Sequence, residues 1–218
     1  GTTYDIIGTN AASKTITLAQ NLGAGVANGA HFKIRKHWTI ASVFGQNNEA
    51  GLQGGDATTA DQILIYNGTG YDIYYYLNFI SPGWKRAADG SDATNQKIYP
   101  DEGIIVKRRG DTAVNVVLLG AVKSGQSSVP IFPGNNVVSN VYASPMTHGS
   151  SNLFTGNAAT GVAGGDATTA DQVLLYNGIG YEIFYYLNFI SPGWKKASDG
   201  RDATAQQIGV RQHDLLST

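Results

Sequence analysis

The stretch DQILIYNGTGYDIYYYLNFISPGWK, residues 61–85, decides the fold. Two runs rich in β-branched and aromatic residues flank Asn67–Gly68, a dipeptide that tolerates the positive φ angles of a tight hairpin turn. Alternate residues of a strand share a face. One face of the second run carries Tyr71, Ile73, Tyr75, Leu77 and Phe79, and the other carries Asp72, Tyr74, Tyr76, Asn78 and Ile80. Both faces hold large side chains, which predicts a β-hairpin that is covered on both sides, with Ile73, Tyr75 and Leu77 largely buried.

This stretch belongs to a segment that occurs twice in the sequence as an internal repeat. Residues 54–98 align with residues 164–208 at an offset of 110; 45 positions compare and 10 differ, so that 45 − 10 = 35 are identical. The loop GGDATTADQ recurs without a change at 54–62 and 164–172. A catalytic loop is needed only once, whereas a repeated loop is typical of architecture. The period exceeds that of solenoid repeats, so we expect each copy to be a small domain or a whole sheet.

Further strands are expected on both sides of the first copy. A hairpin is predicted within residues 3–20, one or two strands within 25–45, and two apolar strands at GIIVKRRG (103–110) and AVNVVLLGAV (113–122). The second copy continues only into GVRQHDLLST, so we expect its sheet to lack strands that the first possesses. No long segment has helical spacing of apolar residues. The sequence therefore predicts an all-β protein of internally duplicated, antiparallel β-sandwich-like units.

We expect three segments along the chain. They are an N-terminal β-hairpin segment (1–36), a first β repeat unit (37–134) and a second, truncated β repeat unit (135–218).

Composition excludes several classes of function. The formal charge is 15 − 16 = −1 and only 14% of residues are charged, so no basic surface predicts nucleic-acid binding. Cysteine is absent, which excludes disulfides, thiolate metal sites and cysteine nucleophiles. No apolar run approaches the ~18–20 residues that span a bilayer. The chain starts at Gly1 rather than at a methionine. We expect a mature or trimmed segment of an exported precursor, located outside the cell or on its surface.

Carboxylates concentrate in two polar loops of each copy. Oxygen ligands at short spacing beside glycine are typical of calcium sites, but the order of an EF-hand is missing. Aspartate and threonine also bind their own backbone in turns, and we favour that interpretation. The weak calcium candidates are Asp56, Asp61, Asp89, Asp92, Asp166, Asp171, Asp199 and Asp202. We predict no cofactor and a calcium-independent fold.

Enzymatic chemistry has little support in the sequence. The four histidines, His31, His37, His148 and His213, lack metal-ligand spacing. The serines lack a nucleophile elbow, and no glycine-rich phosphate loop opens a helix. The sequence does not identify any two carboxylates as the catalytic pair of a glycosidase. We therefore predict that the protein is not an enzyme.

The recurring aromatic residues leave two interpretations open. Exposed tyrosine and tryptophan rings can contact sugars, whereas buried ones fill a core or a subunit interface. The exchange of Tyr74 for Phe184 between the copies favours core or interface packing. The interface or glycan candidates are Tyr74, Tyr76, Trp84, Phe184, Tyr186 and Trp194.

Three segments stand out along the chain: HWTIASVFG (37–45), the tyrosine-rich strand that ends in GWK, and IYPDEGIIVKRRG (98–110). Together they resemble a family of secreted β-strand repeat proteins best represented in Verrucomicrobia. The matching positions are Trp38, Tyr74–Tyr76, Trp84, Pro100–Asp101 and Ile105–Val106. The second copy lacks the third segment. The resemblance implies a β fold and secretion, and the family brings no established activity.

The sequence therefore predicts a subunit of a cell-surface filament, sheath or layer that assembles from copies of itself. The alternative is a secreted carbohydrate-binding or adhesive module whose partners are glycans. A sheet that lacks a strand offers an edge to which a neighbouring chain can add one. The N-terminal segment is the predicted donor, through Thr3, Tyr4, Asp5, Ile6 and Ile7.

Overall fold

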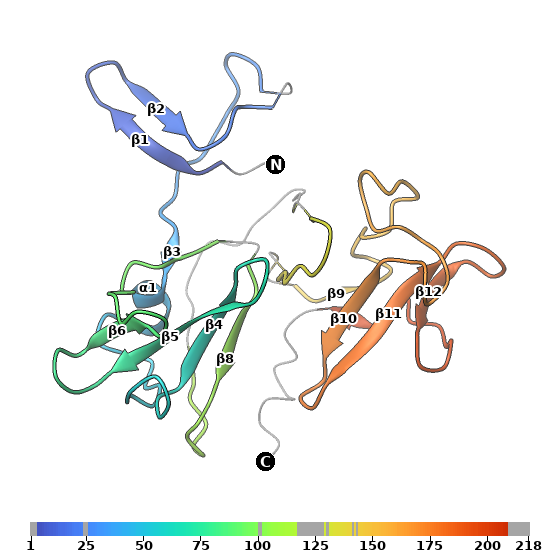
Figure 1. The fold of residues 1–218 in the computed structure, drawn as a ribbon. Coiled ribbons are helices and arrows are strands. Elements are labelled where there is room, and N and C mark those ends of the chain that lie inside the picture. The colour runs from blue at the N-terminus through green and yellow to red at the C-terminus, as the bar shows by residue number, and fades with distance from the viewer. Residues whose placement is uncertain are drawn as a thin grey trace. The chain divides into compact units, whose positions relative to one another are not determined.

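The computed structural model describes residues 4–23, 26–99, 102–116, 129, 131–140, 142 and 144–208. These residues are nearly all β, and their strands pair antiparallel in several sheets (Figure 1). The described residues up to Val137 form one compact unit, and those from Val138 onward form a second. The predicted all-β class is confirmed. In the described part of the chain, no helix is long and apolar enough to cross a membrane.

The hairpin expected from residues 61–85 consists of β4 (Gln62–Tyr66) and β5 (Tyr71–Leu77). Gly68 has a φ of 96°, and the Asn67 side chain accepts hydrogen bonds from the backbone N–H groups of Thr69 and Gly70 at 3.2 and 2.9 Å. The turn therefore forms for the reason that the Asn-Gly dipeptide implies. It sets the register, in which Gln62 pairs with Tyr75 and Tyr66 with Tyr71.

Two further strands extend this hairpin into a sheet of order β6-β5-β4-β8. β6 (Gly83–Arg86) pairs with β5, and β8 (Ile104–Lys107) pairs with the other edge of β4. The expected strand at 103–110 is thus present as β8. Of the expected strand at 113–122, residues 113–116 are not in a strand, and residues 117–122 lie outside the described range.

One face of this sheet carries the core of the first unit. The strand β3 (Trp38–Thr39) pairs with β7 (Lys97–Ile98) and leads into the short helix α1 (Ile40–Phe44). Thr39 caps the helix, because its side chain accepts from the Ser42 N–H while the Ser42 hydroxyl accepts from the Thr39 N–H. The buried cluster is Ile40, Phe44, Leu52, Ile63, Ile65, Tyr74, Trp84, Ala93 and Ile98.

The 25–45 segment contains one strand, β3, as the sequence predicts, and a capping box then starts the helix α1, which the sequence did not predict. The principal core face of β5 is the one that carries Tyr74 rather than the one that carries Ile73. Tyr75 is buried as expected, but Ile73 and Leu77 are only half-buried. The alternation of side chains defines the two faces of β5, but it does not show which of them the helix α1 covers.

The N-terminal hairpin is formed by β1 (Ile6–Asn10) and β2 (Thr15–Leu18), as the sequence predicts. Asp5 ties the start of this hairpin to the segment around β7. Its carboxylate contacts the His37 ring, forms an ion pair with Lys97, and accepts a hydrogen bond from the Tyr99 hydroxyl at 3.0 Å. The hairpin belongs to the first compact unit.

The second unit contains a three-stranded sheet of order β10-β11-β12. It is formed by β10 (Gln172–Tyr176), β11 (Tyr181–Leu187) and β12 (Gly193–Lys196), and a short pair joins β9 (Met146–Thr147) to β13 (Gln207–Ile208). The register matches that of the first sheet, since Gln172 pairs with Tyr185 as Gln62 pairs with Tyr75. Its buried cluster is smaller: Phe184, Trp194 and Ala203.

Candidate functional site

The loop that recurs without a change forms the same turn in both units. Oδ1 of Asp56 accepts hydrogen bonds from the backbone and hydroxyl groups of Thr58 and Thr59, at 2.7 to 2.9 Å. Asp166 makes the equivalent bonds with Thr168 and Thr169. These bonds favour the ionised carboxylate and lower the pKa of Asp56 and of Asp166 to about 2. The loop therefore has the geometry of a self-contained aspartate turn.

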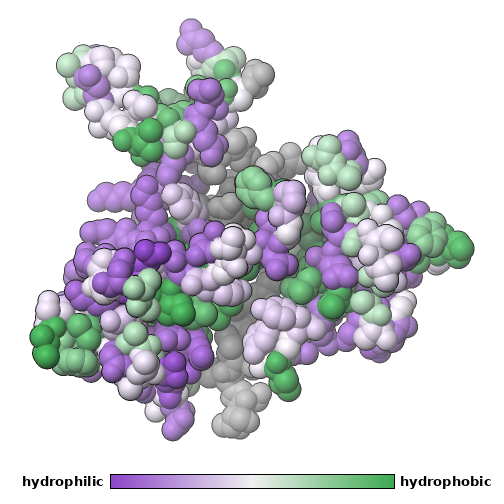
Figure 2. Space-filling model, in the orientation of Figure 1, coloured by the Kyte–Doolittle hydropathy of each residue, from purple (hydrophilic) through white to green (hydrophobic). Residues whose placement is uncertain are grey.

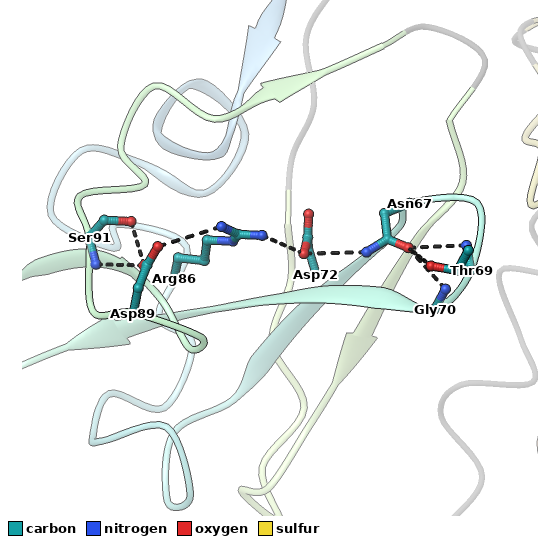
Figure 3. Close-up of polar contacts among 7 residues, drawn as sticks. All are labelled: Asn67, Thr69, Gly70, Asp72, Arg86, Asp89 and Ser91. Atoms are coloured by element: carbon teal, nitrogen blue, oxygen red, sulfur yellow. Dashed lines mark hydrogen bonds and ion pairs between the residues drawn. The ribbon is translucent and has the colours of Figure 1, made fainter.

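The second acidic loop is also satisfied locally. The Asp89 side chain accepts hydrogen bonds from Ser91 and lies 3.5 Å from the Arg86 guanidinium. The same guanidinium lies 2.9 Å from Asp72. These residues form a chain of polar contacts that reaches the Asn67 turn (Figure 3). The remaining carboxylates bind neighbours in the same way: Asp92 accepts from Thr94, Asp199 pairs with Arg201, and Asp202 accepts from Thr204. Among the described residues no group of three or more acidic, histidine or cysteine side chains is placed to hold a metal ion.

Asp61 and Asp171 are the one acidic pair whose surroundings differ sharply. Asp61 is buried, lies 2.6 Å from Nε of Arg108, and accepts backbone N–H bonds from Arg109 and Gln53 at 2.6 and 2.7 Å. Burial by itself would raise the pKa of Asp61, but these bonds and the guanidinium charge outweigh it and hold the pKa below its usual range. Asp171 is exposed, and the N–H of Ala163 donates to it. The difference follows from β8, which brings Arg108 and Arg109 to Asp61.

The aromatic candidates belong to the cores of the two units. Trp84 and Trp194 are 0% and 3% exposed, Tyr74 and Phe184 are also buried, and Tyr76 and Tyr186 are half-buried. The rings of Tyr76 and Trp84 meet edge to face, as do those of Tyr186 and Trp194. None of the four buried rings offers an open face for stacking on a sugar, which agrees with the core interpretation.

A cleft of about 470 Å³ opens beside this core in the second unit. Its lining combines aromatic rings with neutral polar groups and contains no aspartate, glutamate, lysine or arginine. The lining residues are His148, Gly149, Ser150, Asn152, Phe154, Tyr186, Pro192, Gly193, Trp194 and Thr204. The volume is within the range of ~300–1,000 Å³ that is usual for small-molecule sites.

His148 occupies the position that Ile40 holds in the first unit. The Ile40 N–H donates to Gln96 O at 3.1 Å, and the His148 N–H donates to Gln206 O at 3.0 Å. The preceding threonines, Thr39 and Thr147, exchange matching bonds with a serine three residues later. The offset between the units is therefore 148 − 40 = 108 here, whereas it is 172 − 62 = 110 in the strands. The second unit thus fits two more residues between this turn and β10, and no helix forms there.

The His148 ring is enclosed by aromatic residues. It stacks on Trp194 with a centroid distance of 4.7 Å, lies 4.8 Å from Phe184, and is 1% exposed. Nδ1 lies 3.2 Å from Ala203 O, and because a carbonyl only accepts, Nδ1 carries the proton. Burial lowers the pKa of His148, so the ring is neutral at pH 7. Nε2 is then a buried acceptor without a partner among the described residues.

The second unusual feature of this unit is the outer edge of β10. In the hairpin turn, the Asn177 N–H donates to Gly180 O at 2.9 Å. Bonded and non-bonded pairs alternate along an antiparallel ladder, so the backbone groups of Gln172, Leu174 and Tyr176 point away from β11. In the first unit β8 pairs with the equivalent edge of β4. Within the described residues no strand pairs with this edge of β10.

The predicted strand donor is engaged in its own unit. Ile6 and Ile7 lie in β1 and pair with β2, the Tyr4 hydroxyl accepts from the Gly23 N–H at 3.1 Å, and Asp5 holds the contacts described above. Thr3 lies outside the described residues. A single N-terminal strand is therefore not free in this structure, although the outer edges of β1 and β2 have no strand partner among the described residues.

Comparison with known proteins places the chain in no group: no family model, curated protein or solved structure matches it. The sequence did identify Tyr186 and Trp194, but it did not single out His148. The sequence does contain a pattern that marks this histidine. Thr147, His148 and Ser150 follow Met146 in the same spacing in which Thr39, Ile40 and Ser42 follow Trp38, at an offset of 108 residues.

Proposed function

We propose that the protein is a non-enzymatic structural subunit of an extracellular assembly, such as a filament, sheath or surface layer, and that it binds copies of itself. The observation that carries this proposal is the outer edge of β10: no described strand pairs with it, whereas β8 covers the equivalent edge in the first unit. The two edges have nearly the same sequence, QILIY and QVLLY. The first unit therefore supplies an internal example of what such an edge binds.

The exposed side chains of β10 support strand addition. Leu174 is 47% exposed and Tyr176 is 61% exposed, whereas their equivalents in β4, Leu64 and Tyr66, are half-buried. Figure 2 shows hydrophobic residues in several separate places on the surface in view. An apolar strand edge of this kind lacks the usual protection by charge, proline or a covering segment. A strand added here gains main-chain hydrogen bonds and covers apolar side chains at once.

The donor that fits best is the β1–β2 hairpin of a neighbouring copy. Its strands have five and four residues, which matches the four residues that β8 places along β4. Ile7 and Ile16 of the hairpin are 64% and 42% exposed. The hairpin and β10 are different surfaces, so the contact is heterologous. Such a contact continues into a polymer unless its rotation closes a ring.

A proline substitution in β10 tests this proposal. Leu174→Pro removes an outward N–H and leaves the bonds to β11, because proline is tolerated on edge strands when its N–H would face outward. We expect the unaltered protein to sediment as assemblies heavier than one chain, and the Leu174→Pro protein to sediment as a single chain. Leu174→Thr is the matched control, since it keeps the N–H and favours β structure, and it should still assemble.

Two results would contradict the proposal. One is an unaltered protein that remains a single chain at every concentration tested. The other is a Leu174→Pro protein that assembles as well as the Leu174→Thr control. Near-ultraviolet circular dichroism of both variants establishes that each has kept its aromatic core.

A further inference from the structure

The loop between β5 and β6 has the same sequence, NFISP, as the loop between β11 and β12 (residues 78–82 and 188–192). Each loop holds an isoleucine almost entirely in solvent, since Ile80 is 87% exposed and Ile190 is 86% exposed. The phenylalanine before each isoleucine is 48% exposed. The loops project from their sheets (Figure 1), and hydrophobic residues lie at their ends (Figure 2). We call Phe79–Ile80 and Phe189–Ile190 the Phe-Ile tips.

The backbone of each tip has a conformation that isoleucine rarely adopts. Ile80 and Ile190 have φ angles of 41° and 39°, and the serines that follow them have φ angles of 70° and 67°. A β-branched residue at positive φ is an outlier, and glycine or asparagine would adopt this conformation at a lower cost in free energy. Neither isoleucine belongs to the buried cluster of its unit. Backbone strain that carries an exposed apolar side chain in both copies points to a binding role rather than to packing.

The chemistry and the small size of the tip favour a lipid surface as its partner. The NFISP loop has no charged residue, so the attraction is apolar. Two side chains bury far less than the ~800 Å² that each partner contributes to a stable protein interface. Binding to a bilayer needs no matching surface around the tip, because its strength scales with the apolar area that enters the lipid. Pro82 and Pro192 have no N–H, which lowers the number of backbone donors that insertion would remove from water.

We propose that the Phe-Ile tips insert into the surface of a lipid bilayer and attach the protein to it peripherally. The phenylalanine and isoleucine side chains enter the boundary between headgroups and acyl chains, while the sheets stay in water. One small anchor gives only marginal and reversible binding, whereas two anchors on one chain reinforce each other. The duplication of the loop supplies these two anchors. Neither tip includes a residue of β10, so this proposal does not rest on the assembly proposed above.

Co-sedimentation of the full chain with phosphatidylcholine vesicles tests the proposal. We expect the unaltered protein to bind at both low and high ionic strength, because salt screens charges but does not weaken the burial of apolar groups. Ile80→Asn and Ile190→Asn each place a polar residue that tolerates positive φ at the tip. We expect each change to lower the partition into vesicles about tenfold, and the double variant to bind none. The melting temperatures should stay the same or rise, since strain is relieved.

Two further proteins serve as matched controls. Ile80→Leu combined with Ile190→Leu keeps an apolar side chain at each tip, and this protein should bind vesicles like the unaltered one. Ile179→Thr removes an isoleucine that is 97% exposed in the turn at the other end of β11, and it installs the residue of the first unit, Thr69. Its binding to vesicles should not change. The pair separates insertion of the tips from a general effect of exposed apolar residues.

Four results would overturn the proposal. The unaltered protein does not bind phosphatidylcholine vesicles, or the double asparagine variant binds them equally well. Binding requires anionic phosphatidylglycerol and disappears at high salt, which would assign it to surface charges. The double asparagine variant loses assembly without vesicles but keeps vesicle binding, which would assign the tips to contacts between copies. The Leu174→Pro protein keeps both tips and should still bind vesicles, so the two proposals stand or fall separately.

Discussion

Single residues show how the same side chain takes a different role when its neighbours change. Asp61 and Asp171 close identical loops, yet Asp61 is buried against Arg108 whereas Asp171 is exposed. Arg86 and Asp72 form an ion pair in the first unit, and Lys196 and Glu182 form one at 2.7 Å at the equivalent place in the second. Both partners of that pair differ together, so the charge contact is kept while the side chains change.

The buried carboxylate predicts a difference between two matched variants. Asp61→Asn leaves Arg108 without its counter-charge, and we expect the free energy of unfolding to fall by roughly 1.5–3 kcal/mol, since Arg108 keeps some contact with solvent. Asp171→Asn loses little, because its site is exposed. Urea unfolding at neutral pH measures both. Equal losses would mean that the β8 contacts do not distinguish the two carboxylates.

The same carboxylate predicts a dependence of stability on pH. The folded pKa of Asp61 is lowered below the ordinary value of about 3.9. Its contribution to stability is therefore complete above that ordinary value and is lost as the pH falls through the folded pKa. We expect the acid unfolding curve of the Asp61→Asn protein to be less steep in this window than that of the unaltered protein. Parallel curves would show that Asp61 is not the responsible group.

At the scale of elements, the two hairpins are alike and their surroundings are not. β4 lies between β5 and β8, whereas β10 has only β11 beside it among the described strands. The helix α1 covers the core of the first unit, and a turn that carries His148 stands in its place in the second. An element that is covered on one side in one unit and open in the other is where binding is expected.

Amide hydrogen exchange tests the difference between the two edges. The N–H of Leu64 is directed toward β8, and that of Leu174 points outward. In unaltered protein that is dilute enough to be a single chain, we expect the amide at 64 to exchange slowly and the amide at 174 to exchange quickly. Protection at 174 should appear on assembly. Slow exchange at 174 in the single chain would show that this edge is already covered.

At the scale of the whole molecule, the chain divides into two units with cores of unequal size. Among the described residues, the buried cluster of the first unit has nine members and that of the second has three. Buried apolar area is the main favourable term in stability, so the second unit is the weaker one. It is also the unit that holds both the open edge and the cleft, and both features leave polar or apolar groups without partners from the described chain.

Thermal unfolding is therefore expected to occur in two steps. The fluorescence of Trp194 should report the lower transition and that of Trp84 the higher, because the two tryptophans lie in different cores. Trp194→Phe and Trp84→Phe proteins assign each step. A single transition that both residues report together would show that the units unfold as one.

Removal of divalent cations should leave both transitions unchanged. The loop carboxylates are satisfied by threonine, serine, arginine and backbone groups, as at Asp56 and Asp89. Ligands that are already used in turns have no strong preference for a metal ion. A fall of several degrees in either melting temperature on addition of a chelator would show that a cation binds in these loops.

Much of the local structure could be predicted from the sequence, because its causes are local. The Asn-Gly dipeptides, the alternation of large side chains and the aspartate turns act within a few residues, and they yielded the all-β class and the strands β4, β5, β8, β1 and β2. The sequence also predicted that the second sheet lacks a counterpart of β8, and among the described residues no strand pairs with that edge of β10.

Only the tertiary structure decided which groups are buried and which are left without partners. Burial of Asp61 depends on Arg108, 47 residues away in the chain, and the environment of His148 depends on Trp194 and Ala203. The core face of β5 depends on where α1 lies, and the equivalence of Ile40 and His148 emerged only from their hydrogen bonds to β7 and β13 neighbours. Periodicity specifies the faces of a strand, but long-range packing selects the face that is covered. For this reason the hairpins can be predicted from the sequence, whereas the cleft and the orphan nitrogen of His148 cannot.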